Sequence, residues 1–351
     1  MSESARATRR PTMADVAREA GVSLSTVDRV LNLRADVRRD TAQRIVEAAT
    51  RLGFHAKAVL EQRLLTHRPT VRLGFALHKS GVAFYQVLAQ ALSSAAAHYP
   101  HARIRVVIAY LDELDPARVA QRIAALRDQV DGLGVVAVDH PAIRQAVARL
   151  SDSGVAVVAL ISALSPAATA GYVGVDNRRM GRTAGWFVSR LANRPGPVAV
   201  LLSSQGFQCQ ELREFSFRSY LADQSPDWDL LATRLTLEDD AFAHGNTLDL
   251  LTGEPELAGL YVAGGGIAGV IQALGELKAR QQRVPIVVCN EVTPLTAQAL
   301  RDGLVHAVLS HPVAALAERT VDALVQAVTG ARPVAGLVAI VPMQVDVQES
   351  L

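Results

Sequence analysis

The sequence predicts an α/β protein in which three short helices precede a larger, two-lobed domain of doubly wound parallel sheets. The chain has 351 residues, 50% hydrophobic and 20% charged, which exceeds one ordinary core and suggests two or three domains. Residues 1–68 hold 13 Lys and Arg against 8 Asp and Glu, a balance of +5, whereas the remainder holds 23 against 26, a balance of −3. We therefore expect a basic helical module, preceded by a disordered basic tail over residues 1–11, and then a separate α/β domain.

Residues 12–53 predict three helices that bury one another. Thr12 is an N-cap, and Asp15 three residues later completes a capping box at the start of MADVAREA, which stops at Gly21. Ser23 then caps a second helix almost at once, which is the spacing of a helix-turn-helix motif. The third helix, roughly RDTAQRIVEAATRL, carries an apolar stripe that covers the other two.

The second helix has an apolar side and a polar side. At the α-helical period, Val27, Val30 and Leu31 share the side that faces the core. The other side comprises Ser25 and Arg29, flanked by Leu24, Asp28 and Asn32. Short polar side chains of this kind suit contacts with base edges and phosphates. A plain surface helix shows the same pattern, but the basic surroundings and the preceding helix favour DNA binding.

The stretch TMADVAREAGVSLSTVDRVLN, followed by TAQRIVEAATRLGF, resembles the DNA-binding headpiece of the lactose-repressor (LacI-type) family over about 45 residues. The resemblance implies base-reading roles for Leu24, Ser25 and Arg29. It also implies that four further side chains approach phosphates: Thr12, Ser23, Thr26 and Asn32.

Asp28 departs from the family, which carries a small hydroxyl residue at this position. Three interpretations stay open. The carboxylate accepts from a cytosine amino group, it orients Arg29 or Arg34, or it is a solvated acid that weakens non-specific binding.

The segment FHAKAVLEQRLLTHR (54–68) lies where the family has a hinge helix that pushes a leucine into the minor groove. The family's wedge position holds Arg63, with Leu64 beside it, so Leu64 is a candidate for a shifted wedge. The alternative is a flexible basic linker that contacts phosphates through Lys57, Arg63 and Arg68.

After Pro69, near-continuous apolar runs predict strands that are covered on both faces, as in parallel sheets. The runs are 71–77, 104–109, 132–138, 155–161, 198–202, 259–263, 286–289 and 305–309. Helical stretches lie between them; one starts at Asp115-Pro116, an N-cap followed by the first helical residue. The charge-free stretch 153–175 is long enough to span a bilayer, but its glycines and Pro166 divide it into two strands and a loop.

Residues 70–345 resemble the two-lobed, type I periplasmic-binding-protein fold, and its ribose-binding branch more closely than the lactose-repressor branch. YVGVDNRRMGRTA (172–184) is the strongest local match, and RDGLVHAVLSHPV (301–313) resembles the passage after the chain has returned to its first lobe. The resemblance therefore implies a first lobe of about 71–172 and 292–318. The second lobe would comprise about 173–290 and 319–345.

Ligands in such folds bind beyond the carboxyl ends of the strands. Carried over by position, the resemblance proposes Phe84 and Tyr85 as an aromatic pair that stacks on a sugar ring. It also proposes five polar or backbone contacts for the effector: Asp139, Arg213, Gly264, Gly265 and Glu291. His311 takes the place of a further polar residue near the last crossover.

GGGIAG (264–269) replaces the Asn-Asp that the family has after this strand. The run also satisfies the dinucleotide-binding pattern G-x-G-x-x-G after a strand, which leaves an oxidoreductase as an alternative. However, that fingerprint belongs on the first βα turn of its domain. We favour glycines that bring backbone N–H groups to an oxygen-rich or anionic ligand at a helix N-terminus.

The remaining features argue against other classes of protein. Cys209 and Cys289 cannot form a disulfide framework and fit a reducing compartment as buried thiols. The first residues lack the apolar core of a signal peptide. No catalytic motif, metal site or cofactor is predicted, so the chain is not expected to be an enzyme.

These observations together predict a cytoplasmic, homodimeric, ligand-responsive regulator, most simply a repressor, that binds a pseudo-palindromic double-stranded DNA operator. Its effector is expected to be a sugar, polyol, sugar acid or sugar phosphate. A transport-type solute-binding protein is a second alternative, since it would share the large domain but not the headpiece.

Overall fold

The computed structural model describes residues 10–32, 37, 39–54, 68–113, 115–165, 170–224 and 226–350. The predictions for Lys57 and Leu64 fall outside these ranges. The chain divides into a small N-terminal unit, Met1–Thr70 together with Pro100–Arg103, and a large unit, Val71–Tyr99 together with Ile104–Leu351.

The N-terminal unit contains the three predicted helices, α1 (Met13–Ala20), α2 (Leu24–Asn32) and α3 (Arg39–Leu52). The capping box of Thr12 and Asp15 is present, and Gly21 ends α1 in the left-handed conformation at φ 64°. Val16, Val27 and Ile45, one from each helix, are fully buried in the shared core. The predicted helix-turn-helix arrangement is confirmed.

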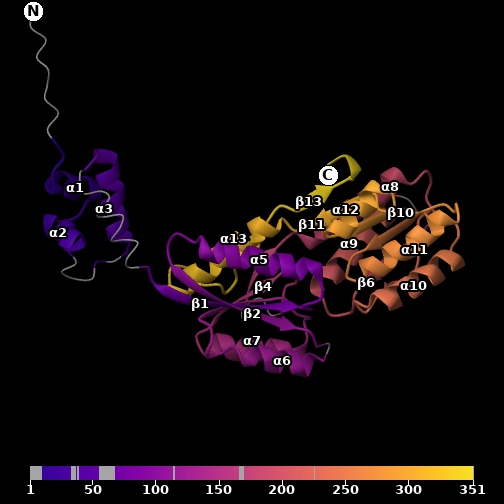
Figure 1. Ribbon diagram of the computed structural model, residues 1–351, viewed down its shortest axis with the longest axis horizontal. Helices are drawn as coiled ribbons and strands as arrows, with labels where there is room; N and C mark the ends of the chain where they lie inside the picture. The colour runs from indigo at the N-terminus through magenta and orange to yellow at the C-terminus, as the bar shows by residue number, and fades with distance from the viewer. Residues whose placement is uncertain are drawn as a thin grey trace, which may run out of the picture. The chain divides into compact units, whose positions relative to one another are not determined.

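The first lobe of the large unit is a six-stranded sheet in the order β12-β5-β4-β3-β1-β2. Its strands are β1 (Thr70–His78), β2 (Arg103–Leu111), β3 (Gly132–Val135), β4 (Ala156–Leu160), β5 (Gly171–Gly174) and β12 (Val338–Ile340). Helices α5 (Ala83–Ala97) and α13 (Val313–Val328) pack together on one face (Figure 1). Helices α6 (Pro116–Ala124) and α7 (Pro141–Asp152) cover the other, and α6 starts at the predicted Asp115 cap.

The second lobe is a seven-stranded sheet whose main path runs β13-β11-β10-β9-β6-β7, with β8 paired to β6. Its strands are β6 (Pro197–Leu202), β7 (Asp229–Leu230), β8 (Arg234–Leu235), β9 (Gly259–Val262), β10 (Ile286–Asn290), β11 (Ala307–Ser310) and β13 (Gln344–Asp346). Helices α8 (Asn177–Leu191) and α9 (Gln208–Gln224) pair with each other, and α8 packs on the central strands. Helices α10 (Asp240–Gly253), α11 (Ile267–Ala279) and α12 (Pro294–Arg301) bury the opposite side, and a 3-10 turn (Gln348–Ser350) ends the described chain.

The predicted chain segmentation of the two lobes was wrong at the second and third crossovers. The chain returns to the first lobe only after β11, because β11 pairs in parallel with β10 of the second sheet (Cys289 beside Val308). It leaves again after β12, which pairs with β5. A buried parallel strand has the same apolar pattern in either sheet, so the run at 305–309 did not reveal which sheet it joins.

All eight predicted apolar runs contain strands, and the stretch 153–175 contains β4 and β5 as expected. Four short strands, β7, β8, β12 and β13, were not predicted; each has only two or three residues. Among the helices that the structure describes, none combines the length and the apolar character that crossing a bilayer requires.

Candidate DNA-reading helix and ligand cavity

The polar side of α2 is open to solvent as predicted. Ser25 and Arg29 are exposed, and Leu24 has a relative exposure of 50%, although it is a large apolar side chain. Val27 is fully buried, and Val30 and Leu31 pack against the same core. The helix therefore presents a short polar face with one protruding leucine at its first turn.

The N-terminus of α2 carries a cluster of hydroxyl groups. Oγ of Ser23 lies 2.8 Å from Oγ of Ser25 and 2.7 Å from Oγ1 of Thr26, and it accepts the backbone N–H of Thr26 at 3.2 Å. Hydroxyls beside the first N–H groups of a helix form a donor-rich end that favours phosphate oxygens. Thr12 occupies the equivalent place on α1, where its hydroxyl donates to Asp15 at 2.7 Å.

Asp28 is tied to its own helix. The side-chain amide of Asn32 donates to Oδ1 of Asp28 at 2.6 Å, one turn further along α2. The acid is thereby fixed beside the exposed face rather than at its centre, and it orients an amide that can itself donate to DNA.

The turn between α1 and α2 is held by α3. The guanidinium of Arg44 donates to the carbonyls of Ala20 and Gly21. A Cβ at Gly21 would lie 3.0 Å from that guanidinium, and the backbone there has φ 64°. Glycine is therefore favoured at this turn both by the close approach of Arg44 and by the left-handed backbone. This contact sets the angle at which α2 leaves α1.

The large unit contains a cavity of about 500 Å³ at the carboxyl ends of the strands of both lobes. This volume lies within the range of about 300–1,000 Å³ that is usual for small-molecule sites. Residues after β1, β3 and β4 line it from the first lobe, and residues after β6, β8, β9 and β10 line it from the second.

Phe84 and Tyr85, at the start of α5, both line the cavity as predicted. Their rings meet edge to face with centroids 5.2 Å apart. Tyr85 also lies 5.8 Å from the ring of His78, and that ring lies 5.3 Å from Phe207 of the second lobe. These rings form an apolar wall suited to the C–H face of a sugar or cyclitol.

Arg213 of α9 lies in the wall of the cavity and is only 4% exposed. Its Nε donates to Oδ1 of Asn177 at 2.7 Å and its Nη1 to the carbonyl of Ala263 at 3.4 Å. Its Nη2 is buried and finds no hydrogen-bond partner among the described residues. A buried N–H without a partner costs free energy, so this group is available to an acceptor that enters the cavity.

Glu291 lines the cavity with a left-handed backbone at φ 68°. His311 holds both carboxylate oxygens: its backbone N–H donates to Oε2 at 3.1 Å, and its Nδ1 lies 2.7 Å from Oε1. His311 itself is buried against Phe84, with ring centroids 6.0 Å apart, and does not line the cavity among the described residues. The pair fixes the carboxylate while leaving lone pairs to accept from a hydroxyl.

Glu238 is a cavity residue that the sequence analysis missed. Burial opposes ionisation of its carboxyl, but the hydrogen bond from His78 and the charges of His78 and Lys79 outweigh that effect and lower its pKa. It follows β8, a strand of two residues that no periodicity revealed. Gln210 and Asn290 also line the cavity and were not predicted from the sequence.

The glycine turn at 264–266 lines the cavity immediately before α11. Its glycines serve internal packing: a Cβ on Gly264 would run into the backbone nitrogen of Ser203, and one on Gly265 would stand 2.7 Å from Cγ of Glu238. Gly266 precedes α11 at φ 81° without a side-chain cap, and the first two residues of the helix, Ile267 and Ala268, also line the cavity. Protein atoms already account for the glycines, and a dinucleotide is not needed to explain them.

Asp139 is not among the described residues that line the cavity. Its carboxylate accepts the backbone N–H of Ser165 at 3.1 Å and pairs with Arg144 at 3.3 Å. Its position after β3 made it a candidate, but its side chain holds a loop of the first lobe.

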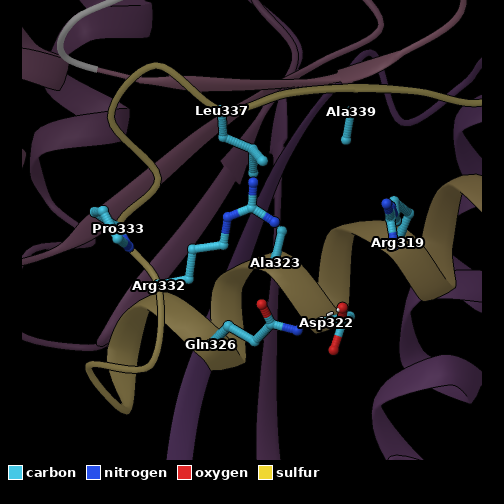
Figure 2. Close-up of a pocket in the computed structure, with 8 residues that line it drawn as sticks. All are labelled: Arg319, Asp322, Ala323, Gln326, Arg332, Pro333, Leu337 and Ala339. Carbon is cyan, nitrogen blue, oxygen red and sulfur yellow. Dashed lines mark hydrogen bonds between the residues drawn. The ribbon is translucent and has the colours of Figure 1, made fainter.

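A second depression lies between α13 and the segment that follows it (Figure 2). Its volume of about 70 Å³ is too small for a sugar, and Asp322 is already occupied by Gln326 at 2.9 Å and Tyr99 at 3.0 Å. Within the described ranges, no three His, Cys, Asp or Glu side chains gather as a metal ion would require. A larger hollow of about 690 Å³ beside α6 is lined by residues of the first lobe alone, among them the exposed Asp112, Arg118 and Arg122. The cavity between the lobes, which has the buried Arg213 in its wall, is the better candidate for a ligand site.

Comparisons with known families agree with this division. Residues 73–332 match the family model described as a periplasmic binding protein domain, and residues 12–57 match that of bacterial regulatory proteins of the lacI family. Among curated proteins, the chain is similar to catabolite control protein A from Streptococcus mutans serotype c (34% identity over 122 residues) and from Priestia megaterium (31% over 122 residues). Each match covers 35% of this chain and 35% of the relative, about a third of the relatives' length.

Solved structures of ABC-transporter solute-binding proteins share the fold of the large unit. One from Bacillus halodurans with bound myo-inositol has a TM-score of 0.70 at 17% identity and covers 80% of this chain and 96% of its own. One from Burkholderia graminis in complex with D-arabinose has a TM-score of 0.71 at 20% identity, with 80% and 96% covered. One from Actinobacillus succinogenes with bound D-allose has a TM-score of 0.71 at 17% identity, with 81% and 99% covered.

Proposed function

We propose, from the premise that the chain belongs to the periplasmic binding protein domain family and carries a LacI-family DNA-binding domain, that it is a transcriptional regulator controlled by a small oxygen-rich effector. One observation carries the proposal. The same chain holds a helix-turn-helix module with an exposed polar face on α2 and a cavity of about 500 Å³ with an unsatisfied buried arginine.

The DNA-binding half acts through the exposed side of α2. Arg29 is the best donor for a bidentate contact with guanine, and Leu24 and Ser25 stand beside it on the same face. Two headpieces of a homodimer would read the two half-sites of a pseudo-palindrome, and binding near a promoter would make the protein a repressor that works in the cytoplasm. No catalytic role is proposed for any residue.

The effector half binds a small molecule rich in hydroxyl groups. The aromatic pair Phe84 and Tyr85 suits a ring face, Arg213 supplies a free N–H, and Glu291 supplies acceptors for hydroxyls. The ligands in the similar transport proteins, myo-inositol, D-arabinose and D-allose, fit this chemistry. Sugars and polyols are therefore the first candidate effectors. Sugar acids and sugar phosphates are further candidates, because α11 begins at the cavity and the N-terminus of a helix favours anionic groups.

Control arises when the effector favours one arrangement of the two lobes. A ligand that contacts both lobes binds one arrangement more tightly, and the difference in affinity changes the population that can bind the operator. A transport-type solute-binding protein would share the cavity, but it would have no use for residues 12–57.

The test has two arms on the full chain. Thermal-shift measurements with a panel of sugars, polyols, sugar acids, sugar phosphates, NAD and NADP identify a stabilising ligand, and mobility-shift assays with selected DNA measure operator affinity with and without it. Arg213→Met should abolish stabilisation by the ligand while sparing DNA binding, since Arg213 lies in the large unit. Arg194→Met, which removes an exposed arginine that pairs with exposed Glu256, is the control. Stabilisation by NAD or NADP alone would overturn the proposal in favour of an oxidoreductase.

A further inference from the structure

The two lobes contact each other through the carboxylate of Glu238, in the wall of the cavity. Glu238 follows β8 of the second lobe, whereas His78 ends β1 of the first lobe. Nε2 of His78 lies 2.7 Å from Oε2 of Glu238, and each side chain is only 9% exposed. A carboxylate so far removed from water is much less screened from its partners than one at the surface.

Lys79, the next residue of the first lobe, reinforces the contact. Its ammonium lies 3.7 Å from Oε2 of Glu238 and donates to the backbone carbonyl of the same residue at 3.3 Å. Glu238 therefore receives donors from two consecutive residues of the first lobe, at its side chain and at its backbone. Removing the carboxylate would leave His78 and part of Lys79 buried without their partner.

The backbone on both sides of the contact is held in an unusual conformation. Lys79 has φ 35°, and Leu237 and Glu238 have φ 55° and 51°, all in the left-handed region that non-glycine residues rarely adopt. Such residues persist where surrounding contacts over-determine them, often at switch regions. Gly265 leaves the space that Glu238 occupies, because a Cβ there would stand 2.7 Å from its Cγ.

We propose that Glu238, His78 and Lys79 form an interlobe latch. The latch holds the two lobes closed without an effector, and a ligand in the cavity changes the closure by contacting Glu238. The same carboxylate lines the cavity. An effector hydroxyl that donates to Glu238 competes with His78 for its lone pairs, and a ligand that avoids Glu238 leaves the latch intact. The hydrogen bonds that a ligand makes to Glu238 thus decide whether the latch stays closed and the lobes stay together.

The chain offers a matched control for the latch. His244 and Glu276 form a second histidine–glutamate contact at 2.8 Å, but they lie on α10 and α11, which belong to the same lobe. Breaking that pair removes a histidine–glutamate contact that is more exposed, 23% and 36% against 9% for each partner of the latch, without changing the connection between the lobes.

The test measures lobe separation directly in the full-length, ligand-free protein. Spin labels at Gln121→Cys on α6 and Gln272→Cys on α11 report the distance between the lobes by pulsed electron resonance; both positions are exposed, whereas Cys209 and Cys289 are buried. We expect one narrow distance in the parent and after Glu276→Gln. After Glu238→Gln we expect a longer, broader distribution.

Two further variants keep the inference testable where Glu238→Gln impairs folding. Lys79→Met should lengthen the distance less than Glu238→Gln, and His78→Gln, whose amide still donates a hydrogen bond, should lie between parent and Glu238→Gln. Unchanged distances in all three latch variants, or an open parent, would overturn the latch. Because the readout uses neither DNA nor effector, its failure leaves the proposed regulator intact, and the regulator's failure leaves the latch intact.

Discussion

Gly269 on α11 sits where a single methyl group should shift the wall of the cavity. A Cβ at this position would overlap the backbone carbonyl oxygen of Asp240 and stand 2.7 Å from the backbone nitrogen of His244. Both obstacles are main-chain atoms of α10, so they cannot rotate aside, and the two helices must separate. Because α11 begins at the glycine turn that lines the cavity, the turn must move as well.

The magnitude follows from two opposing effects. Replacing a glycine inside a helix with alanine favours folding by about 0.5–1 kcal/mol, and this is an upper bound for Gly269 in the first turn of α11. Overpacking a close helix contact costs about 1–3 kcal/mol, and we take the upper part of that range because backbone must yield. Gly269→Ala should therefore lower the free energy of unfolding by about 1–2 kcal/mol, a fall of about 2–4 °C in Tm per kcal/mol.

Gly275→Ala on the same helix is the control, since nothing lies within 4 Å of its added Cβ. Gly275→Ala should raise the free energy of unfolding by about 0.5–1 kcal/mol. Because both variants replace glycine with alanine, the effect on the unfolded chain cancels when their stabilities are compared. The assay is urea unfolding followed by the fluorescence of Trp186 and Trp228, the chain's two tryptophans, which both lie in the second lobe. The packing argument is refuted if the two alanine variants are equally stable.

Three further predictions concern the headpiece and the latch. Arg29→Ala should weaken operator binding by about 1–3 kcal/mol and relax one base position, which binding-site selection would detect; an unchanged selected site would contradict the assigned face. Asp28→Ser should strengthen binding to all DNA alike, because it removes a negative charge; a changed base preference in the same selection would instead give Asp28 a reading role. The lowered pKa of Glu238 means that its stabilising contribution is present above the unfolded pKa, near 4.5, and lost as pH falls through the lower folded value. The stability difference between the parent and Glu238→Gln should thus shrink below about pH 4.5 in urea unfolding at a series of pH values, and a difference that stays constant into acid would contradict the assignment.

The sequence predicted the headpiece closely because its signals are local. Thr12, Asp15 and Gly21 act on groups within one or two turns, so the capping box and the left-handed stop of α1 followed from spacing alone. The apolar period likewise placed Val27 in the core and Arg29 in solvent.

The cavity was predicted less completely because its residues come from both lobes. Glu291 and the glycine turn follow strands, where parallel folds collect polar groups, whereas Arg213 of α9 was proposed from the family resemblance. Asp139 shares that position along its strand, yet its carboxylate turns to Ser165. Glu238 follows a strand too short to leave a periodic pattern, so nothing local pointed to it.

The sequence by itself determined the longer strands of the large unit, where the headpiece helices begin and end, and that the large unit is an α/β fold. Tertiary structure alone decided that β11 joins the second sheet, that His311 supports Glu291 from behind, and that Glu238 meets His78 across the lobes. The physical reason is the separation along the chain of the residues that interact. Caps and periodicity depend on neighbours within about four residues, whereas sheet membership and interlobe contacts depend on pairings between residues such as His78 and Glu238, far apart in the chain.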